Sequence, residues 1–384
     1  MLPYGKQTID EADIQAVVDV LRSDWLTTGP IVDQFEEAFS NYTNAYSATS
    51  VCNGTAALQT AMHALGIQAS DEVIVPALTF CATSNAVLYQ GGTPVFADVS
   101  ADTLLIDVDD VANKITPKTK AIIAMDYAGQ PCDYQSLRHL ADTFGLLLVA
   151  DACHSLGATY REQPVGGLAD LNCFSFHPVK PLTSGEGGMI TVNTADSKRA
   201  QQLTQDLRAF RNHGIQSDHR SRHRTGQFEY DMTQLGFNLR LTDIQCALGM
   251  SQLSKLDSFT KRRQEIAAEY GHQLKGLTAY KPLTQLAHRT HAYHLMVIRC
   301  QSDRNRVFQE LRHRGISANV HYRPVYQHSF YRARFETHSA QCPIAEQAYK
   351  EILSLPIFPE LTNQQIEFVN QSLAEIALGT PISA

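Results

Sequence analysis

Residues 146–155 read LLLVADACHS, and this stretch decides the fold. Its first five residues form an unbroken apolar run, whereas a strand with one face in water alternates apolar and polar side chains. An unbroken run suits a strand that is covered on both faces, so it predicts a mainly parallel sheet with helices on both sides. Ligands of such sheets bind at the carboxyl ends of the strands, which directs attention to Asp151.

Other short apolar runs extend this pattern along the chain. The expected strands are 72–76, 95–98, 121–125, 146–151, 173–176 and 189–192, with helices between several of them, for example 55–65 and 134–144. Thr8 and Glu11 predict a capping box at the start of the first helix.

The regular alternation of apolar strands and helices ends after a helix expected near 242–255. The expected elements that follow are a long charged helix (261–274), short strands near 292–299, a helix at 304–314, the aromatic-rich segment NVHYRPVYQHSFYR (319–332) and a closing helix near 363–376. We therefore predict a large α/β domain over residues 1–255, including an N-terminal arm, and a smaller α/β domain over residues 256–384.

The composition argues against several classes of protein. The net charge of −7 opposes a general attraction to nucleic acid or to an anionic membrane. No apolar run approaches the roughly 20 residues that cross a bilayer, and the polar N-terminus does not resemble a signal peptide. The eight cysteines form no CxxC pair, so we expect reduced, buried thiols, no metal site and a cytoplasmic protein.

Asp151 is the first candidate for chemistry, because a carboxylate at the end of a buried strand is costly without a cation or strong donors. It could hold a pyridine nitrogen protonated, so that the ring accepts electrons. The competing interpretation is an N-cap for a following helix, and for this residue alone it is the better supported one.

Lys180 lies in the segment CFSFHPVKPLTSGEGGMI, residues 173–190. The chain leaves a strand at Ser175, presents the lysine between two prolines, and returns through glycines to the next strand. Burial would lower the pKa of such a lysine and favour Schiff-base chemistry. An isolated lysine is usually a solvated surface charge, so the surrounding segment carries this hypothesis.

Two further segments could bind a planar, phosphorylated molecule. Gly54 and Thr55 stand at the start of a helix, where free amides and a hydroxyl form an anion site, although simple capping is the alternative. Phe80 follows another strand and could stack on a ring, although a core phenylalanine is the default.

The basic segment 208–224 allows three interpretations. Its arginines and histidines could form a nucleic-acid arm or a metal cluster, but the acidic total opposes the first and the irregular histidine spacing weakens the second. A loop that serves a diphosphate is the more plausible interpretation.

Taken in order, the motifs resemble those of a known family. They are similar to motifs of the sugar aminotransferases of the DegT/DnrJ/EryC/StrS type. The motifs are NGTAAL (53–58), PALTF (76–80), ATSNA (82–86), DACHSLGA (151–158), SFHPVK (175–180), LTSGEGG (182–188) and LGFNLRLTDIQCALG (235–249). The resemblance covers nearly the whole chain and implies the aspartate aminotransferase fold, which is fold type I of the enzymes that use pyridoxal 5′-phosphate (PLP). Cys153 and Leu239 depart from the usual serine or alanine and the usual aromatic residue.

The resemblance implies a role for each matching position of the cofactor site. Lys180 would form a Schiff base with PLP and shuttle a proton, with pyridoxamine phosphate as the intermediate form. Asp151 would pair with the pyridine nitrogen, with His154 beside it. The remaining cofactor contacts implied are Phe80 on the ring and Gly54, Thr55 and Ser175 on the phosphate.

A second subunit is also implied. Asn238 would reach the phosphate of the neighbouring subunit, with Arg240 near it, which makes a homodimer with shared active sites the working unit. The implied substrate-binding residues are Tyr4, Asp24, Trp25, Leu26, Thr27, Arg240, His321, Tyr322, Arg323 and Pro324.

Within the family, DYAGQPCD (126–133) and NVHYRPVYQHSFYR most resemble the enzymes of pseudaminic acid biosynthesis. This resemblance implies amination of C4 of a UDP-linked 2-acetamido-2,6-dideoxy-4-keto-hexose, with L-glutamate as donor. The alternatives are another keto sugar, on a UDP-pentose or a dTDP- or GDP-hexose, and a non-catalytic regulator that keeps the fold.

Overall fold

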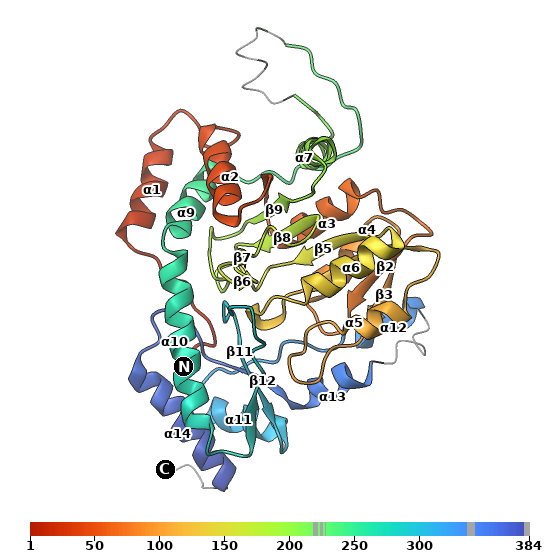
Figure 1. Cartoon of the computed structure of the whole chain (residues 1–384). Coiled ribbons are helices and arrows are strands. Elements are labelled where there is room, and N and C mark those ends of the chain that lie inside the picture. The colour runs from red at the N-terminus through yellow and green to blue at the C-terminus, as the bar shows by residue number, and fades with distance from the viewer. Residues whose placement is uncertain (218–221, 223–225, 227, 336–341, 380–384) are drawn as a thin grey trace.

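A seven-stranded sheet forms the centre of the molecule in the computed structural model, which describes residues 1–217, 222, 226, 228–335 and 342–379 (Figure 1). Its order is β1-β9-β8-β5-β4-β2-β3. The strands are β1 (Ser47–Val51), β2 (Glu72–Pro76), β3 (Thr93–Ala97), β4 (Thr119–Met125), β5 (Leu147–Asp151), β8 (Leu171–Ser175) and β9 (Gly188–Val192). From β8 to β3 all neighbours are parallel, which confirms the predicted sheet, while β9 runs antiparallel to both β8 and β1.

Helices cover this sheet. α3 packs against β8 and β9, α6 against β5, and α4 against β2 and β3. The helices in this part of the chain are α1 (Glu11–Leu21), α2 (Pro30–Thr43), α3 (Gly54–Ala64), α4 (Cys81–Tyr89), α5 (Val108–Asn113), α6 (Tyr134–Phe144), α7 (Ser197–Phe210) and α9 (Asp243–Leu253), with the short η1 (Tyr127–Gly129). A two-stranded ribbon joins β6 (Thr159–Tyr160) to β7 (Gln163–Pro164).

The C-terminal part is built on a three-stranded antiparallel sheet with the order β10-β11-β12. Its elements are β10 (Tyr280–Pro282), β11 (Met296–Cys300), β12 (Ile352–Leu355), α10 (Leu256–Leu274), α11 (Arg304–His313), η2 (Val325–Gln327), α12 (Ser329–Phe335), α13 (Pro343–Glu351) and α14 (Asn363–Leu378). A separate apolar core lies among α10, α11, α14 and this sheet. The division at residue 255 stays a prediction.

Two details differ from the sequence-based expectations, each for a physical reason. The first helix is capped by Asp10 and Asp13, which bond each other's backbone amides, and not by Thr8 and Glu11. β1 was not predicted because its sequence, SATSV, has only two apolar residues; pairing with β9 supplies its hydrogen bonds.

All eight cysteines are free. Five are buried as expected, whereas Cys52, Cys81 and Cys153 are half-buried. Within the described ranges, no helix combines the length and apolar character that a membrane span requires. The described histidine, cysteine and acidic side chains do not gather into a group of three that could hold a metal ion.

Candidate active site

A cavity of about 620 Å³ opens around Lys180 at the carboxyl ends of the central strands. It brings together ten of the residues singled out in the sequence. These are Tyr4, Gly54, Thr55, Phe80, Asp151, His154, Ser175, Lys180, His321 and Tyr322. Since they are spread over most of the chain, the sheet edge and the segment before η2 together create the site.

Lys180 is presented by a tight turn after β8. The Lys180 amide donates to the carbonyl of His177 at 2.9 Å, and Phe176 and Gly187 close the base of the turn through a 2.8 Å bond. A Cβ on Gly188 would lie 2.5 Å from the carbonyl oxygen of Asn53, so only glycine lets the returning chain approach the start of α3. Burial lowers the pKa of Lys180, although nearby Cys153 and Asp151 oppose this shift.

Asp151 ends β5 with its side chain almost fully buried. Its carboxylate accepts a 2.6 Å hydrogen bond from the Thr83 hydroxyl and a 3.3 Å bond from the amide of Cys153. The chain then enters a turn at residues 153–157, so Asp151 does not cap a helix and that interpretation is wrong. The carboxylate is instead held in the wall of the cavity that contains Lys180.

The start of α3 forms an anion cradle with Ser175. Asn53 caps the helix by accepting from the amide of Ala56, while the first amides of a helix have no intrahelical acceptor. A Cβ on Gly54 would lie 2.7 Å from Cβ of Ser175, so the absence of a side chain at residue 54 keeps this space open. Amides and hydroxyls in this arrangement suit a phosphate group.

Aromatic rings line another side of the cavity. Phe80 is the N-cap residue of α4 and 53% exposed, so it is not the core residue of the default interpretation. Its ring centroid lies 5.9 Å from that of Tyr322, whose hydroxyl is 3.1 Å from Nε2 of the buried His154. An exposed ring at a cavity wall can stack on a planar ligand.

Residues from the N-terminal arm and the segment before η2 complete the cavity. The Tyr4 ring lies 5.3 Å from that of His321, and burial raises the pKa of Tyr4 against the effect of a bond with Asn319. His321 is fixed at 2.9 Å from the Ser354 hydroxyl and at 3.2 Å from the Asn319 amide. These polar groups could recognise the hydroxyls of a sugar.

The other residues expected in the substrate site lie outside this cavity in the single chain. Residues 24–27 are tied to the start of α9, since Leu26 accepts from the amide of Asp243 at 3.1 Å and Thr27 forms a bridge with Thr242. Arg323 and Pro324 adjoin the cavity in sequence without lining it.

Asn238 is exposed and forms a bridge with Asn212. Arg240 donates a 2.8 Å bond to the side chain of Asn212.

A basic pocket of about 460 Å³ lies beside these residues. Arg208, Arg211, Arg222, Arg240 and His213 line it, whereas Arg220 and Arg224 of the same segment lie outside the described residues. Burial and the charge of Arg211 lower the pKa of Arg240. Although Asp33 also lines the pocket, the four arginines outnumber this acidic residue, and an excess of positive charge favours an anionic ligand.

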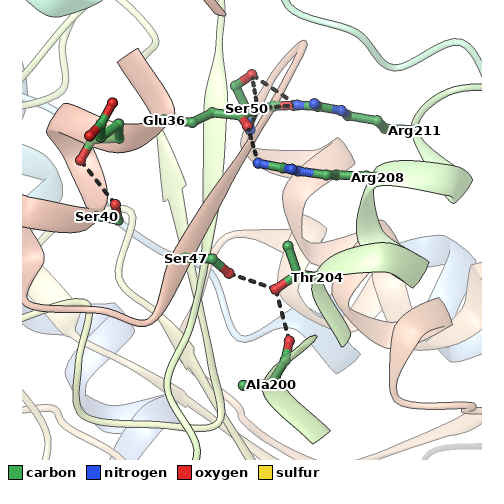
Figure 2. A network of polar contacts seen from close by, with 9 residues as sticks. Glu36, Ser40, Ser47, Ser50, Ala200, Thr204, Arg208 and Arg211 are labelled. Atoms are coloured by element: carbon green, nitrogen blue, oxygen red, sulfur yellow. Dashed lines mark hydrogen bonds and ion pairs between the residues drawn. The ribbon is translucent and has the colours of Figure 1, made fainter. Parts of the chain in front are cut away.

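A buried carboxylate anchors the pocket. Figure 2 shows Glu36 and Ser50 meeting Arg208 and Arg211. Glu36 pairs with Arg211 and, at 2.9 Å, with Arg208, and it accepts from the Ser50 amide and hydroxyl at 2.9 Å each. Although burial raises the pKa of Glu36, the charges of Arg211 and Arg208 overcome this and lower it. The network joins α2 and the end of α7 to β1, three residues before the cradle.

Sequence reasoning missed several residues that the cavity contains. Among them are Glu186, His294 and Asn319. Asn319 opens the segment already singled out, and position alone could have indicated it. His294 follows no strand end or motif, and only the tertiary structure reveals it.

These residues fit the expected cofactor, PLP. The Gly54–Ser175 cradle suits its phosphate, the Phe80 ring can cover one face of the pyridine, and the buried Asp151 carboxylate suits the ring nitrogen. Lys180 supplies the amine from the same cavity wall.

Comparison with known proteins gives the same picture. Residues 7–374 match the DegT/DnrJ/EryC1/StrS aminotransferase family. The spore coat polysaccharide biosynthesis protein SpsC of Bacillus subtilis is 35% identical over 390 residues, covering 98% of this chain and 97% of SpsC. Spr1654 of Streptococcus pneumoniae, solved in its PMP form, superposes with a TM-score of 0.93 at 31% identity over 99% of this chain and 100% of that one.

A further solved structure is that of PseC from Helicobacter pylori, an aminotransferase involved in the biosynthesis of pseudaminic acid. It superposes with a TM-score of 0.90 at 32% identity, and the match covers 98% of this chain and 99% of that one.

Proposed function

Because the chain belongs to the DegT/DnrJ/EryC1/StrS aminotransferase family and is a PLP-dependent sugar aminotransferase, we propose that it aminates C4 of a UDP-linked 2-acetamido-2,6-dideoxy-4-keto-hexose. The amino donor is L-glutamate, and the product belongs to the route to pseudaminic acid. The similarity to PseC over nearly the whole chain carries this choice of substrate. The enzyme works in the cytoplasm.

Each residue of the cavity has a task in this proposal. Bound PLP supplies a ring that accepts electron density from the reacting carbon. Lys180 Nζ would hold the cofactor covalently between turnovers and, as a free amine, would move the proton to and from the reacting carbon. The Asp151 carboxylate, oriented by Thr83, keeps the ring nitrogen protonated. The first amides of α3 and the Ser175 hydroxyl hold the phosphate.

The sugar nucleotide takes the outer part of the cavity. Tyr4, Asn319 and His321 present hydroxyl, amide and imidazole groups toward it. The arginines of the basic pocket serve the diphosphate. In this proposal the segment 208–224 binds a diphosphate, as expected from the sequence, and is not a nucleic-acid arm.

The working unit is a homodimer. Between α7 and α9, the described residues 211–217 and 228–242 lie at one side of the body of the chain (Figure 1), and they expose apolar side chains near Asn238. Those side chains are Phe228, Met232, Leu235 and Phe237. Apolar patches of this kind mark protein–protein contacts. In the dimer Asn238, Arg240 and residues 24–27 complete the neighbouring cavity, which explains why they lie outside the cavity of their own chain.

A second substrate is supported by the similarity to SpsC, a protein of spore coat polysaccharide biosynthesis. In this alternative the enzyme aminates another nucleotide-linked 4-keto sugar. The fold and Lys180 would be unchanged, and only the outer part of the cavity would differ.

Turnover of a panel of 4-keto sugars tests the choice. The purified enzyme is incubated with PLP, glutamate and the UDP-acetamido, dTDP, GDP or UDP-pentose keto sugar, and each product is identified by NMR. We expect the UDP-acetamido sugar to give the highest kcat/KM. Faster amination of another sugar would establish the alternative. If glutamate removes the visible absorbance of the bound PLP but no sugar is turned over, both choices of substrate are contradicted.

A further inference from the structure

Lys180 has a hydrogen-bonding neighbour from a distant part of the chain. Its Nζ lies 3.5 Å from Nε2 of His294, a residue 114 positions later. His294 is 5% exposed and belongs to the stretch between β10 and β11. Its Nδ1 has no hydrogen-bond partner within the described ranges of the chain. The contact between Lys180 Nζ and Nε2 is therefore the hydrogen bond available to the His294 ring among the described residues.

The backbone holds His294 in place by a close contact with η1. The amide of Ala292 donates to the carbonyl of Gly129 at 2.9 Å, and the amide of Leu295 donates to that of Ala128 at 3.1 Å. A Cβ on Gly129 would lie 2.9 Å from the amide nitrogen of Tyr293 and 3.1 Å from that of His294, so only glycine permits this approach.

Tyr293 adds a second sign of constraint. Its φ of 46° lies in the left-handed region, which is costly for a bulky residue. Strained backbone of this kind persists where the surroundings over-determine it, and it concentrates at functional sites. Tyr293 directly precedes His294, so the strained conformation lies in the segment that the backbone bonds to η1 hold in place.

The imidazole of His154 packs beside that of His294. The His154 ring lies 4.3 Å from the His294 ring, and its Nδ1 likewise has no partner in the described part of the chain. Burial, reinforced by the charge of Lys180, lowers the pKa of both histidines well below the usual range, so both rings are neutral at pH 7. The titratable and charged groups that act on Lys180 or His294 are Asp151, Cys153, His154, Arg263 and His321, and His291 acts on His154.

We propose that His294 is a positioning residue whose Nε2 accepts a hydrogen bond from the Lys180 amine and so orients that amine at the cavity wall. The proposal rests on the function proposed for Lys180. A protonated amine can only donate, so a neutral imidazole must accept from it. The stretch that carries β10 and β11 thereby controls the direction and the proton affinity of the group that reacts.

Two substitutions separate this role from simple packing. His294→Phe keeps a planar ring and removes the acceptor, whereas His294→Gln keeps an acceptor oxygen at similar reach. Because misplaced reacting groups slow a reaction strongly, we expect kcat to fall about tenfold or more in His294→Phe, with KM changed less than about twofold. His294→Gln should recover most of the loss. His139→Phe, at an exposed position of α6, is the control.

The second readout does not depend on turnover. Trinitrobenzenesulfonate reacts with unprotonated amines, so the pH dependence of Lys180 labelling in the full-length, PLP-free protein reports its proton affinity. Loss of an acceptor disfavours the ammonium form, so the labelling midpoint should fall in His294→Phe and stay near the unsubstituted value in His294→Gln and His139→Phe.

Two results would overturn the proposal. One is an unchanged midpoint and kcat in His294→Phe, and the other is a loss in His294→Gln as deep as in His294→Phe. Borohydride treatment of the PLP-loaded protein distinguishes failure of the proposed function. Absence of a covalent tag on Lys180 would contradict that function, while the labelling midpoints still decide whether His294 acts on the amine.

Discussion

Gly54 and Ser175 approach so closely that a Cβ on Gly54 would lie 2.7 Å from Cβ of Ser175 and 3.1 Å from its Oγ. The contact joins the start of α3 to the end of β8 and leaves the space in which a phosphate fits. The two residues are 121 positions apart, and the central sheet brings them together.

Gly54→Ala should weaken PLP binding about tenfold or more, which corresponds to about 1.4 kcal/mol, because the methyl group fills the cradle. Titration of the PLP-free protein by absorbance measures the Kd. Gly271→Ala in α10 is the matched control, since no atom lies within 4 Å of its Cβ. Equal affinity of the two variants would contradict the placement of the phosphate.

Lys180→Ala should abolish turnover and leave the fold intact. The variant has no amine for the covalent attachment of PLP, so borohydride reduction should leave no tag on peptide 173–190. Lys281→Ala, at an exposed lysine, should keep both turnover and the tag. Any measurable transamination by Lys180→Ala would refute the role assigned to this residue.

Thr83→Val should reduce the free energy of unfolding by about 2 kcal/mol, because the buried Asp151 carboxylate loses the 2.6 Å bond from the hydroxyl. Thr60→Val in α3 provides the contrast. The Thr60 hydroxyl is buried with no partner among the residues described, so its removal should be neutral or stabilising. Urea unfolding of both variants tests this difference, and equal losses would show that the bond to Asp151 contributes little.

Glu36→Gln should cost about 3 kcal/mol of unfolding free energy, since it leaves Arg211, whose side chain is 13% exposed, beside a neutral buried group. The lowered pKa of Glu36 also makes stability depend on pH. The unfolded chain binds the proton more tightly, so the contribution is present above the usual pKa of 4.5 and is lost as the pH falls through the lowered value.

Urea midpoints measured from pH 7 to pH 3 should therefore fall more steeply for the unsubstituted protein than for Glu36→Gln. Glu37→Gln, at the exposed neighbouring position of α2, is the control and should retain the steep dependence. If the urea midpoints of the unsubstituted protein and of Glu36→Gln fall in parallel with pH, the Glu36 carboxylate does not determine the loss of stability in acid.

Leu235→Glu should convert the proposed dimer to a monomer and remove most of the activity, because in that dimer each active site would need residues from the neighbouring subunit. Leu235 is 77% exposed in the single chain. Leu378→Glu, at an 82% exposed leucine of α14, should remain dimeric and active. Sedimentation velocity gives the state of each variant, and a dimeric Leu235→Glu protein would place the interface elsewhere.

The sequence by itself determined the parallel part of the sheet, the strand end at Asp151, the turn that presents Lys180 and the glycine that begins α3. Each of these features depends on residues that are close together in the sequence, because apolar runs, prolines and glycines act on the backbone within a few residues. Capping at Asp10 and strand β1 escaped prediction, since competing caps stood close together and a polar strand gains its bonds from a distant partner.

Only the tertiary structure decided which distant side chains meet. His294 beside Lys180, Glu36 between two arginines, and Thr83 on Asp151 are contacts between groups separated by 68 to 175 positions. Such pairs leave no periodic trace in the sequence, because their proximity depends on how the sheet and the C-terminal part pack. Burial then shifts the pKa of groups such as Lys180 and His294, and burial exists only in the folded chain.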